Sequence, residues 1–140
     1  MVRKSAAGFT LIELIVVIVI LAIMAAVVIP RVIGRAQDAR ISSAMSDIKS
    51  FDDALDMYKA DIGEYPTNDQ GLNALLTKSD PKWNGPYLKN QTSIPLDPWG
   101  TPYKYQIPGG SGRDYDISSA GPDKQFGTAD DIQSWNISGK

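Results

Sequence analysis

Residues 8–29 have the sequence GFTLIELIVVIVILAIMAAVVI, and this stretch decides how the chain is organised. Beyond residue 13 every residue up to Ile29 is apolar, and only Thr10 and Glu13 interrupt the run before that point. An α-helix rises about 1.5 Å per residue, so the run predicts a helix about 30 Å long, which matches the hydrocarbon core of a bilayer. Basic residues stand on both sides of the run, so the positive-inside rule leaves its orientation open.

Two simple interpretations of this segment are a cleaved secretory signal peptide and a plain single-pass anchor. The first is disfavoured because the basic leader, residues 1–8, is short and no small-x-small cleavage site closes the run. The second leaves Glu13 unexplained, because an acid inside a spanning helix costs up to about 3 kcal/mol at the bilayer centre. Glu13 lies one helical turn after Phe9. A cut between Gly8 and Phe9 would create an α-amine able to neutralise Glu13 of a neighbouring copy and set the register of a helix stack.

Pro30 follows the apolar run, and both a helix break at the membrane surface and a kink or hinge remain open there. Past this point apolar residues recur every three or four positions, as in an amphipathic helix, at Ile41, Met45, Ile48, Phe51, Leu55, Tyr58 and Ile62. Gly63 is a natural stop, so the pattern predicts one helix from Phe9 to about Ile62, about 80 Å long. Charged residues mostly cover the opposite face, where solvation is the ordinary expectation.

The remaining chain is rich in turn signals and predicts a small head. A short helical piece is expected at residues 70–76, and strands are expected at residues 103–107, 115–118 and 132–137, with residues 108–112 as a hairpin loop. The predicted fold class is α+β. A long N-terminal helix, with a membrane-spanning half and an amphipathic half, packs on a three-stranded antiparallel sheet, and a long loop lies between helix and sheet.

The composition excludes several classes of protein. The chain has no cysteine and no histidine, so it can form neither a disulfide framework nor a thiolate metal site, and it lacks the commonest general base. An enzyme is therefore not expected. The net charge of −2 is no electrostatic signature for nucleic acid.

Residues 119–131 form the most acidic loop of the head, with Asp123, Asp130 and Asp131 around a glycine-containing turn. Carboxylates clustered this closely repel one another, and a hard cation bound by several oxygens would remove that repulsion. Calcium tolerates irregular loops of this kind and accepts backbone carbonyls as ligands. The spacing is not that of an EF-hand, and a solvated acidic turn remains the alternative.

The hexapeptide from Gly8 to Glu13 resembles the class III signal of type IV pilins and pseudopilins. The resemblance implies that a prepilin peptidase cuts after Gly8 and methylates Phe9, and that Glu13 serves assembly. It divides the chain into a cleaved leader (residues 1–8), a transmembrane and filament-core helix (residues 9–33) and a periplasmic head (residues 34–140). It also favours a kink or hinge at Pro30.

Three head segments, at residues 65–72, 94–100 and 116–123, resemble the major pseudopilins of type II secretion systems. The resemblance implies a Ca2+ ion in the acidic loop, with carboxylate ligands from Asp123, Asp130 and Asp131. Its expected backbone carbonyl ligands are those of Ala120, Gln125 and Thr128. Pro122 departs from the family pattern at the entry to the loop, and the Thr128–Ala129 spacer is shorter than in some relatives. The absence of cysteine favours this branch, because many adhesive pilins close their C-terminal loop with a disulfide.

The expected function is that of a major structural subunit of a pseudopilus, which polymerises from the bacterial inner membrane into a periplasmic filament that helps drive folded proteins through the outer membrane. The expected partners are further copies of the chain, minor pseudopilins, the inner-membrane assembly platform, the prepilin peptidase and, before assembly, membrane lipid. Two alternatives remain. One is a type IV pilin for adhesion, motility or DNA uptake, and the other is a calcium-dependent binding module on a membrane stalk.

Overall fold

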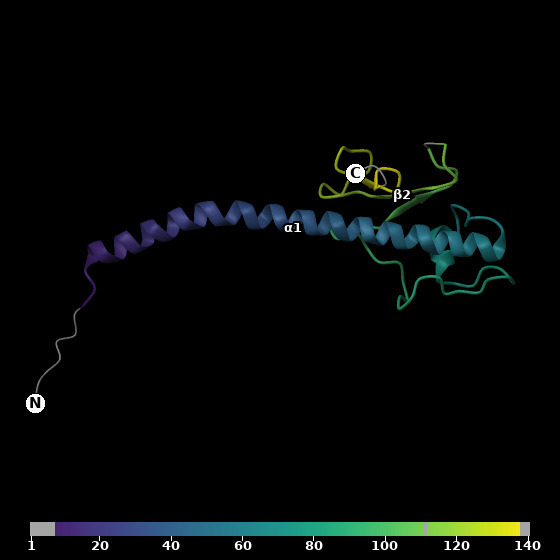
Figure 1. Cartoon of the computed structure of the whole chain (residues 1–140), viewed down its shortest axis with the longest axis horizontal. Coiled ribbons are helices and arrows are strands. Elements are labelled where there is room, and N and C mark those ends of the chain that lie inside the picture. Colours follow the sequence, from purple (N-terminus) through teal and green to yellow (C-terminus); the bar gives the residue numbers. More distant parts are fainter. Residues whose placement is uncertain (1–7, 111, 138–140) are drawn as a thin grey trace, which may run out of the picture. The chain divides into compact units, whose positions relative to one another are not determined.

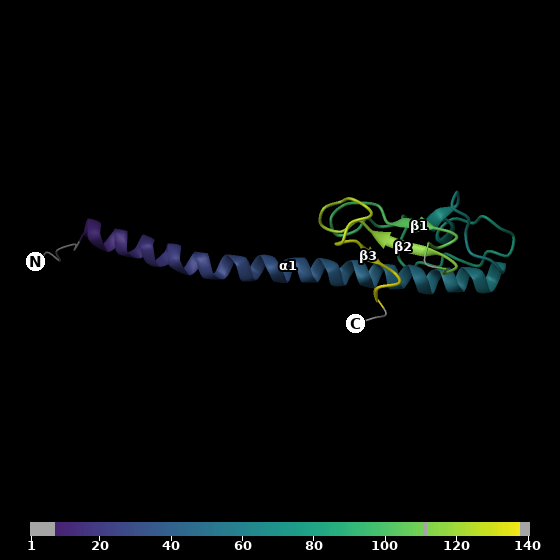
Figure 2. The same cartoon turned by 90° about the horizontal axis from the view of Figure 1, so that it is seen from above.

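The computed structural model describes residues 8–110 and 112–137, except for the side chains of residues 27–33. The chain divides into two compact units, residues 1–38 and residues 39–140. Its elements are α1 (Leu11–Ile62), the 3-10 helix η1 (Gly71–Leu75), β1 (Lys104–Gln106), β2 (Asp116–Ser119) and β3 (Ile132–Gln133). Figure 1 shows the whole chain, and Figure 2 labels α1 and the three strands. The α+β class, the antiparallel sheet and the short helical piece are confirmed, the last in the tighter 3-10 form.

The three strands form one antiparallel sheet in the order β1-β2-β3. Tyr105 of β1 pairs with Ile117 of β2, and Ser119 at the end of β2 pairs with Ile132 at the start of β3. Ile117 and Ser119 are fully buried, whereas the residues between and before them are only half-buried. One face of β2 therefore meets the core, as the two-residue period of a strand requires.

The core of the head forms on the C-terminal part of α1. Ile48, Phe51, Leu55 and Tyr58 are buried, which confirms the predicted stripe, and Ala44 and Ala54 widen it. The buried residues that pack with them from the rest of the head are Leu72, Ala74, Leu75, Leu88, Trp99, Tyr103, Ile117 and Ile132. The helix ends at Ile62 because Gly63 adopts a positive φ of 104°, which glycine reaches without steric cost.

The third strand is shorter than the sequence predicts. It ends at Gln133, and the prediction that it continues to residue 137 is wrong. The Ser134 N–H still donates to the Ile117 carbonyl at 2.9 Å, but the Ile117 N–H donates to the Ser134 hydroxyl at 3.2 Å instead of to a backbone carbonyl. The chain then turns, with the Asn136 N–H donating to the Gln133 carbonyl. A side chain thus replaces the backbone acceptor, and the strand ladder stops.

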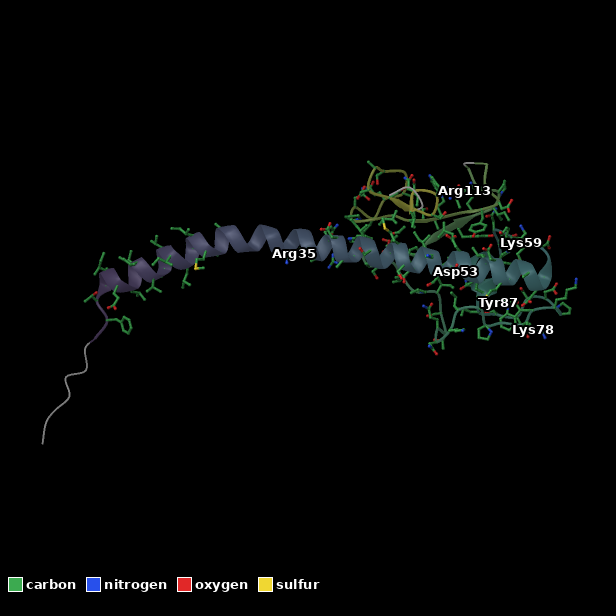
Figure 3. The ribbon with its side chains drawn as sticks, viewed as in Figure 1. Arg35, Asp53, Lys59, Lys78, Tyr87 and Arg113 are labelled. Atoms are coloured by element: carbon green, nitrogen blue, oxygen red, sulfur yellow. The ribbon has the colours of Figure 1, made fainter. Side chains whose placement is uncertain are left out.

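The charged face of α1 is also different from the expectation of a merely solvated surface. Four tyrosine hydroxyls from the head donate hydrogen bonds to four aspartates of the helix, in the pairs Tyr103–Asp47 (2.8 Å), Tyr115–Asp52 (3.1 Å), Tyr65–Asp56 (3.0 Å) and Tyr87–Asp61 (2.8 Å). Burial and the neighbouring aspartates raise the pKa of Tyr103 and of Tyr115, so both remain protonated donors. Lys59, labelled with Tyr87 in Figure 3, forms an exposed ion pair with Asp114 at 3.3 Å.

Candidate functional site

The N-terminal unit presents an apolar helix surface. The large apolar side chains between Phe9 and Met24 are all exposed, with exposed fractions from 45% at Ile15 to 82% at Phe9. A contiguous apolar surface of this extent is typical of a region that meets lipid or another protein chain. Figure 3 shows these side chains standing out around the first turns of α1.

Of the four residues predicted for processing and assembly, Glu13 lies in the first turn of α1, Gly8 and Phe9 lie just before that helix, and Pro30 lies farther along it. Thr10 caps the helix, because its hydroxyl accepts the Glu13 N–H at 3.3 Å and its carbonyl accepts the Leu14 N–H at 3.2 Å. Glu13 lies in the first turn, where a negative charge interacts favourably with the helix dipole. Glu13, Phe9 and Gly8 are exposed, and no ion pair within residues 8–110 and 112–137 involves Glu13.

The predicted membrane-spanning segment and the predicted role of Pro30 both involve residues that the structure describes only in part. Within the described part of the chain, no helix combines the length and the apolar character that crossing a membrane requires. α1 continues through Pro30, so the alternative of a helix break at that position is wrong. The side chain of Pro30 is one of those at residues 27–33 that the structure does not describe. The proposed role of Pro30 as a kink or hinge stays a prediction.

The acidic loop, here residues 120–131, joins β2 to β3. Because Ser119 pairs with Ile132, the two ends of the loop are held side by side by the sheet. Inside the loop the Asp123 N–H donates to Asp130 Oδ2 at 3.2 Å, and the Gly127 N–H donates to Asp131 Oδ2 at 2.7 Å. The carboxylates therefore organise the loop from within, which the sequence did not indicate.

Three predicted ligand residues, Gln125, Asp130 and Asp131, meet at the side chain of a fourth, Thr128. Its hydroxyl oxygen lies 2.7 Å from Asp130 Oδ1, 3.4 Å from Asp131 Oδ1 and 3.2 Å from the Gln125 carbonyl oxygen. A hydroxyl carries one hydrogen, so it can donate a full bond to only one of these three acceptors. The loop thus concentrates oxygen atoms and negative charge at one point. Hydrogen bonding, first of all from the Thr128 hydroxyl, holds the pKa of Asp130 below its usual range, so Asp130 is ionised at neutral pH.

The other two predicted ligand residues are placed differently. The Asp123 carboxylate accepts the Gln125 N–H at 2.9 Å, and Ala120 is fully buried at the mouth of the loop. Within the described residues, no group of three or more acidic side chains is gathered as a ready metal cluster. Asp130 and Asp131 do converge, and the carboxylate, carbonyl and hydroxyl oxygens around Thr128 are the ligand types that calcium prefers. The donor set therefore fits a hard cation in chemistry.

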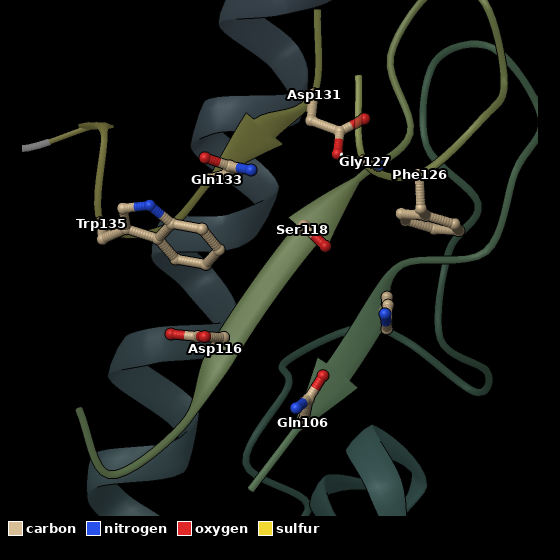
Figure 4. Close-up of a pocket in the computed structure, with 9 residues that line it drawn as sticks. Gln106, Asp116, Ser118, Phe126, Gly127, Asp131, Gln133 and Trp135 are labelled. Carbon is tan, nitrogen blue, oxygen red and sulfur yellow. Dashed lines mark hydrogen bonds between the residues drawn. The ribbon is translucent and has the colours of Figure 1, made fainter. Parts of the chain in front are cut away.

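The loop also borders a shallow cavity of about 170 Å³ on the face of the sheet shown in Figure 4. Gln106, Ser118 and Gln133 line it from the three strands, and Phe126 and Asp131 line it from the loop. The lining side chains from the strands are polar, whereas Ile117, next to Ser118 in β2, is buried in the core on the opposite face of the sheet. The cavity is small against the several hundred cubic ångströms usual for a small-molecule site.

Comparison with known proteins places these features in a family. Residues 31–135 match the family model of type II secretion system protein G, and residues 3–29 match the prokaryotic N-terminal methylation motif. The chain belongs to the type II secretion system protein G family. The methylation motif covers Gly8 and Phe9, which lie just before α1, and Glu13, which lies in its first turn.

Individual relatives agree with this family. The chain is 45% identical to the type II secretion system core protein G of Aeromonas hydrophila, over 98% of this chain and 97% of the relative. It is 46% identical to the core protein G of Pseudomonas aeruginosa, over 97% of this chain and 99% of the relative. It also resembles the crystal structure of the major pseudopilin from the type 2 secretion system of enterohaemorrhagic Escherichia coli, with a TM-score of 0.61 and 37% identity over 74% of this chain and 93% of that one.

These findings confirm the predicted resemblance and the predicted function as a major pseudopilin of the protein G family. The chain is a structural pseudopilin of the secretion system, so neither the adhesive pilin nor the stalked binding module is carried further. The leader, helix and head boundaries at residues 8 and 33, the cleavage site and the calcium ligands stay predictions.

Sequence reasoning missed the roles of Asp97 and Ser119, which it quoted only as parts of family-like motifs. The structure buries both side chains and joins them by a hydrogen bond. An aspartate between Pro95 and Pro98 is a signal that such a residue orders a turn, because proline removes backbone donors and aspartate accepts from nearby N–H groups.

Proposed function

We propose that this chain is the major structural subunit of a type II secretion pseudopilus. Copies wait in the bacterial inner membrane with residues 9–33 inserted and the head in the periplasm. They then leave the membrane to form a periplasmic filament on an inner-membrane assembly platform, together with minor pseudopilins. Growth of the filament helps to drive folded proteins through the outer membrane. No covalent chemistry is assigned to the subunit.

The observation that carries this proposal is the exposed apolar surface of the N-terminal part of α1, with the single acid Glu13 in the first turn. The apolar side chains from Phe9 to Met24 have no cover in their own unit, so they require lipid before assembly and other copies of the helix after it. Lipid and neighbouring helices are equally apolar, so transfer between them is not opposed by the hydrophobic effect. Glu13 distinguishes the two states, because in a stack of helices the amine of a neighbouring chain can supply its counter-charge.

The positive charge that pairs with Glu13 is the α-amine created by proteolytic processing. A prepilin peptidase cuts between Gly8 and Phe9 and methylates the new amine, which then lies one helical turn from Glu13 of its own chain. In a filament the amine of one copy pairs with Glu13 of the next. Pairing offsets the cost of burying the carboxylate in only one axial register, so it selects the correct helical stack.

Substitution of Glu13 tests the assembly step. We expect Glu13→Ala to yield a processed, membrane-inserted subunit whose filament assembly falls by at least tenfold in a reconstituted secretion system, measured by shearing and quantitative immunoblotting. The matched control is Glu64→Ala, since Glu64 is an exposed glutamate in the head. Normal filaments from Glu13→Ala would remove the register argument.

Mass spectrometry of the mature protein tests the processing step separately. The expected N-terminus is N-methylated Phe9. A mature chain that still carries residues 1–8 would overturn the proposal, because the amine would then be far from Glu13.

We also propose that the loop of residues 120–131 binds one Ca2+ ion. The ligands are carboxylate oxygens of Asp123, Asp130 and Asp131 and carbonyl oxygens of Ala120, Gln125 and Thr128. The support is the convergence of Asp130, Asp131 and the Gln125 carbonyl on the Thr128 hydroxyl, together with the lowered pKa of Asp130. The ion would neutralise this charge and hold the loop closed next to the β2–β3 pair.

Thermal melting of the full-length chain in detergent tests the calcium site. A ligand present at about 100 times its Kd stabilises by about 2.7 kcal/mol, so replacing calcium by EGTA lowers the wild-type Tm by several degrees. Asp130→Asn abolishes that difference, whereas Asp69→Asn, at an exposed aspartate outside the loop, preserves it. An EGTA-insensitive wild-type Tm would refute the calcium proposal and leave the pseudopilin function standing.

A further inference from the structure

Asp97 is a buried carboxylate in the loop before β1, with an exposed fraction of 3%. Its Oδ1 atom accepts the N–H groups of Trp99 and Thr101 at 3.1 and 2.7 Å, and its Oδ2 atom accepts the Ser119 hydroxyl at 2.6 Å. A buried charge is costly unless donors surround it, and these three donors offset that cost. Two of the bonds are local to the turn, but the third reaches the end of β2.

The Ser119 hydroxyl passes this interaction on to the acidic loop. Ser119 is fully buried, and its oxygen accepts the Gly121 N–H at 3.2 Å while its hydrogen goes to Asp97. Because the Asp97 carboxylate can only accept, it fixes the direction of the hydroxyl and leaves the oxygen lone pairs toward Gly121. One carboxylate thereby orients a backbone N–H in a different segment of the chain.

Gly121 has little freedom at this position. Its φ is +67°, and a Cβ atom there would press against the carbonyl oxygen of Asp130. Its own carbonyl accepts the Lys124 N–H at 3.2 Å, which starts the turn of the loop. The Ala120–Gly121 segment is therefore held on one side by Ser119 and lies directly against the backbone of Asp130 on the other.

We propose that Asp97 is a positioning residue for the loop of residues 120–131. Through the Ser119 hydroxyl it holds the Ala120–Gly121 segment against Asp130, and so presets the mouth of the loop for an oxygen-bound divalent cation. This inference rests on the calcium role proposed above for the same loop. It gives the buried Asp97 a function that reaches beyond its own turn, since the loop before β1 then supports the site between β2 and β3.

The test compares two buried serines in the full-length chain in detergent. Ser119→Ala removes the relay, and Ser134→Ala is the matched control. The Ser134 hydroxyl is also buried and accepts one backbone N–H at 3.2 Å, but that N–H belongs to Ile117 and not to the loop. Asp97→Asn is a second variant of nearly equal shape, in which an N–H2 donor replaces the acceptor of the Ser119 hydroxyl.

Amide hydrogen exchange in EGTA measures the positioning without any metal. Ser119→Ala and Asp97→Asn are expected to speed exchange across residues 120–131 by at least tenfold, whereas Ser134→Ala leaves this segment unchanged. Calorimetric titration with Ca2+ is then expected to give a Kd at least tenfold weaker for the first two variants than for the third.

The outcomes separate the two proposals. Loop exchange in Ser119→Ala and Asp97→Asn equal to that in Ser134→Ala overturns the positioning role, whatever the metal result. Faster loop exchange with unchanged calcium affinity also overturns it, because the positioning would not serve the cation. A wild-type chain that binds no Ca2+ defeats the calcium proposal, and with it the stated purpose of Asp97, while faster exchange would still establish the contact between the two segments.

Discussion

Both ends of α1 carry large aliphatic side chains, but these side chains have opposite surroundings. Ile18 and Ile20 are 56% and 52% exposed, whereas Ile48 and Leu55 on the same helix are fully buried by the head. The C-terminal end finds its apolar partners in its own chain. The N-terminal end has no such partners among the described residues, and under the proposed function lipid or other copies of the helix supply them. Apolar composition alone therefore does not say whether a residue serves folding or assembly, and the presence of partners within the chain decides it.

The largest expected difference between the two ends appears when the same substitution, isoleucine to alanine, is made in each part of the helix. We expect Ile48→Ala to destabilise the head by about 2–5 kcal/mol, because it leaves a cavity in the core. Ile18→Ala, its matched partner, leaves the Tm of the purified chain unchanged and reduces filament yield instead. Thermal melting and quantitative shearing of filaments measure the two effects.

A loss of stability in Ile18→Ala as large as that in Ile48→Ala would show that the N-terminal segment is packed within its own chain. The distinction between a folding end and an assembly end would then be wrong.

A pair of glycines sharpens the same distinction inside the acidic loop. Gly121 and Gly127 both have positive φ, 67° and 94°, but a Cβ at Gly121 meets the Asp130 carbonyl while one at Gly127 meets nothing within 4 Å. Gly127→Ala is expected to cost about 1 kcal/mol from backbone strain alone. Gly121→Ala adds a clash with the chain itself, so it lowers the Tm further and removes the response to EGTA. Equal Tm values for the two variants would mean that the loop moves away from Gly121 at no cost.

The smallest expected effect concerns Asp52, which lies beside the exposed Asp53 on α1. Burial raises the pKa of Asp52, although its hydrogen bond from Tyr115 acts in the opposite direction. A raised folded-state pKa means that the folded state prefers the protonated acid, so this contribution is present below the unfolded pKa near 3.9 and is lost as the pH rises through the folded pKa. Asp52→Asn stays neutral, so it gains less than about 1 kcal/mol over wild type at pH 7, and the gain disappears below about pH 4.

Thermal melting between pH 3 and pH 8 checks this expectation, with Asp53→Asn as the control that changes little with pH. A gain for Asp52→Asn that grew as the pH fell would reverse the sign and show that the ionised form is favoured in the folded head.

Local patterns explain why much of the fold was predictable. The three- and four-residue spacing of Ile48, Phe51 and Leu55 predicts the buried face of α1, since a helix repeats every 3.6 residues. The end of the helix at Gly63 follows from the freedom of glycine at positive φ. The loop that carries Asp130 and Asp131 was also found, because clustered acids are visible in a sequence.

Contacts between distant segments were not predictable in the same way. No local pattern around Ser134 predicts that its hydroxyl will accept the Ile117 N–H. This hydrogen bond replaces the backbone pairing that would have continued β3. The tyrosine bonds to the aspartates of α1 join residues up to 63 positions apart. Thr128 was predicted only as a carbonyl ligand. That its hydroxyl is the point where the loop oxygens meet depends on the turn geometry, which the sequence does not show.

The sequence by itself determined the long helix and the single acid near its start. It also determined that apolar side chains surround the N-terminal part of the helix and occupy only one face of the C-terminal part. Each of these features is a local pattern of side chains along one element. Only the tertiary structure decided which aspartates are solvated, where β3 stops and how Asp97 reaches the acidic loop. These depend on which donors and acceptors the folded chain brings within about 3 Å of one another, and hydrogen bonds act only over such distances.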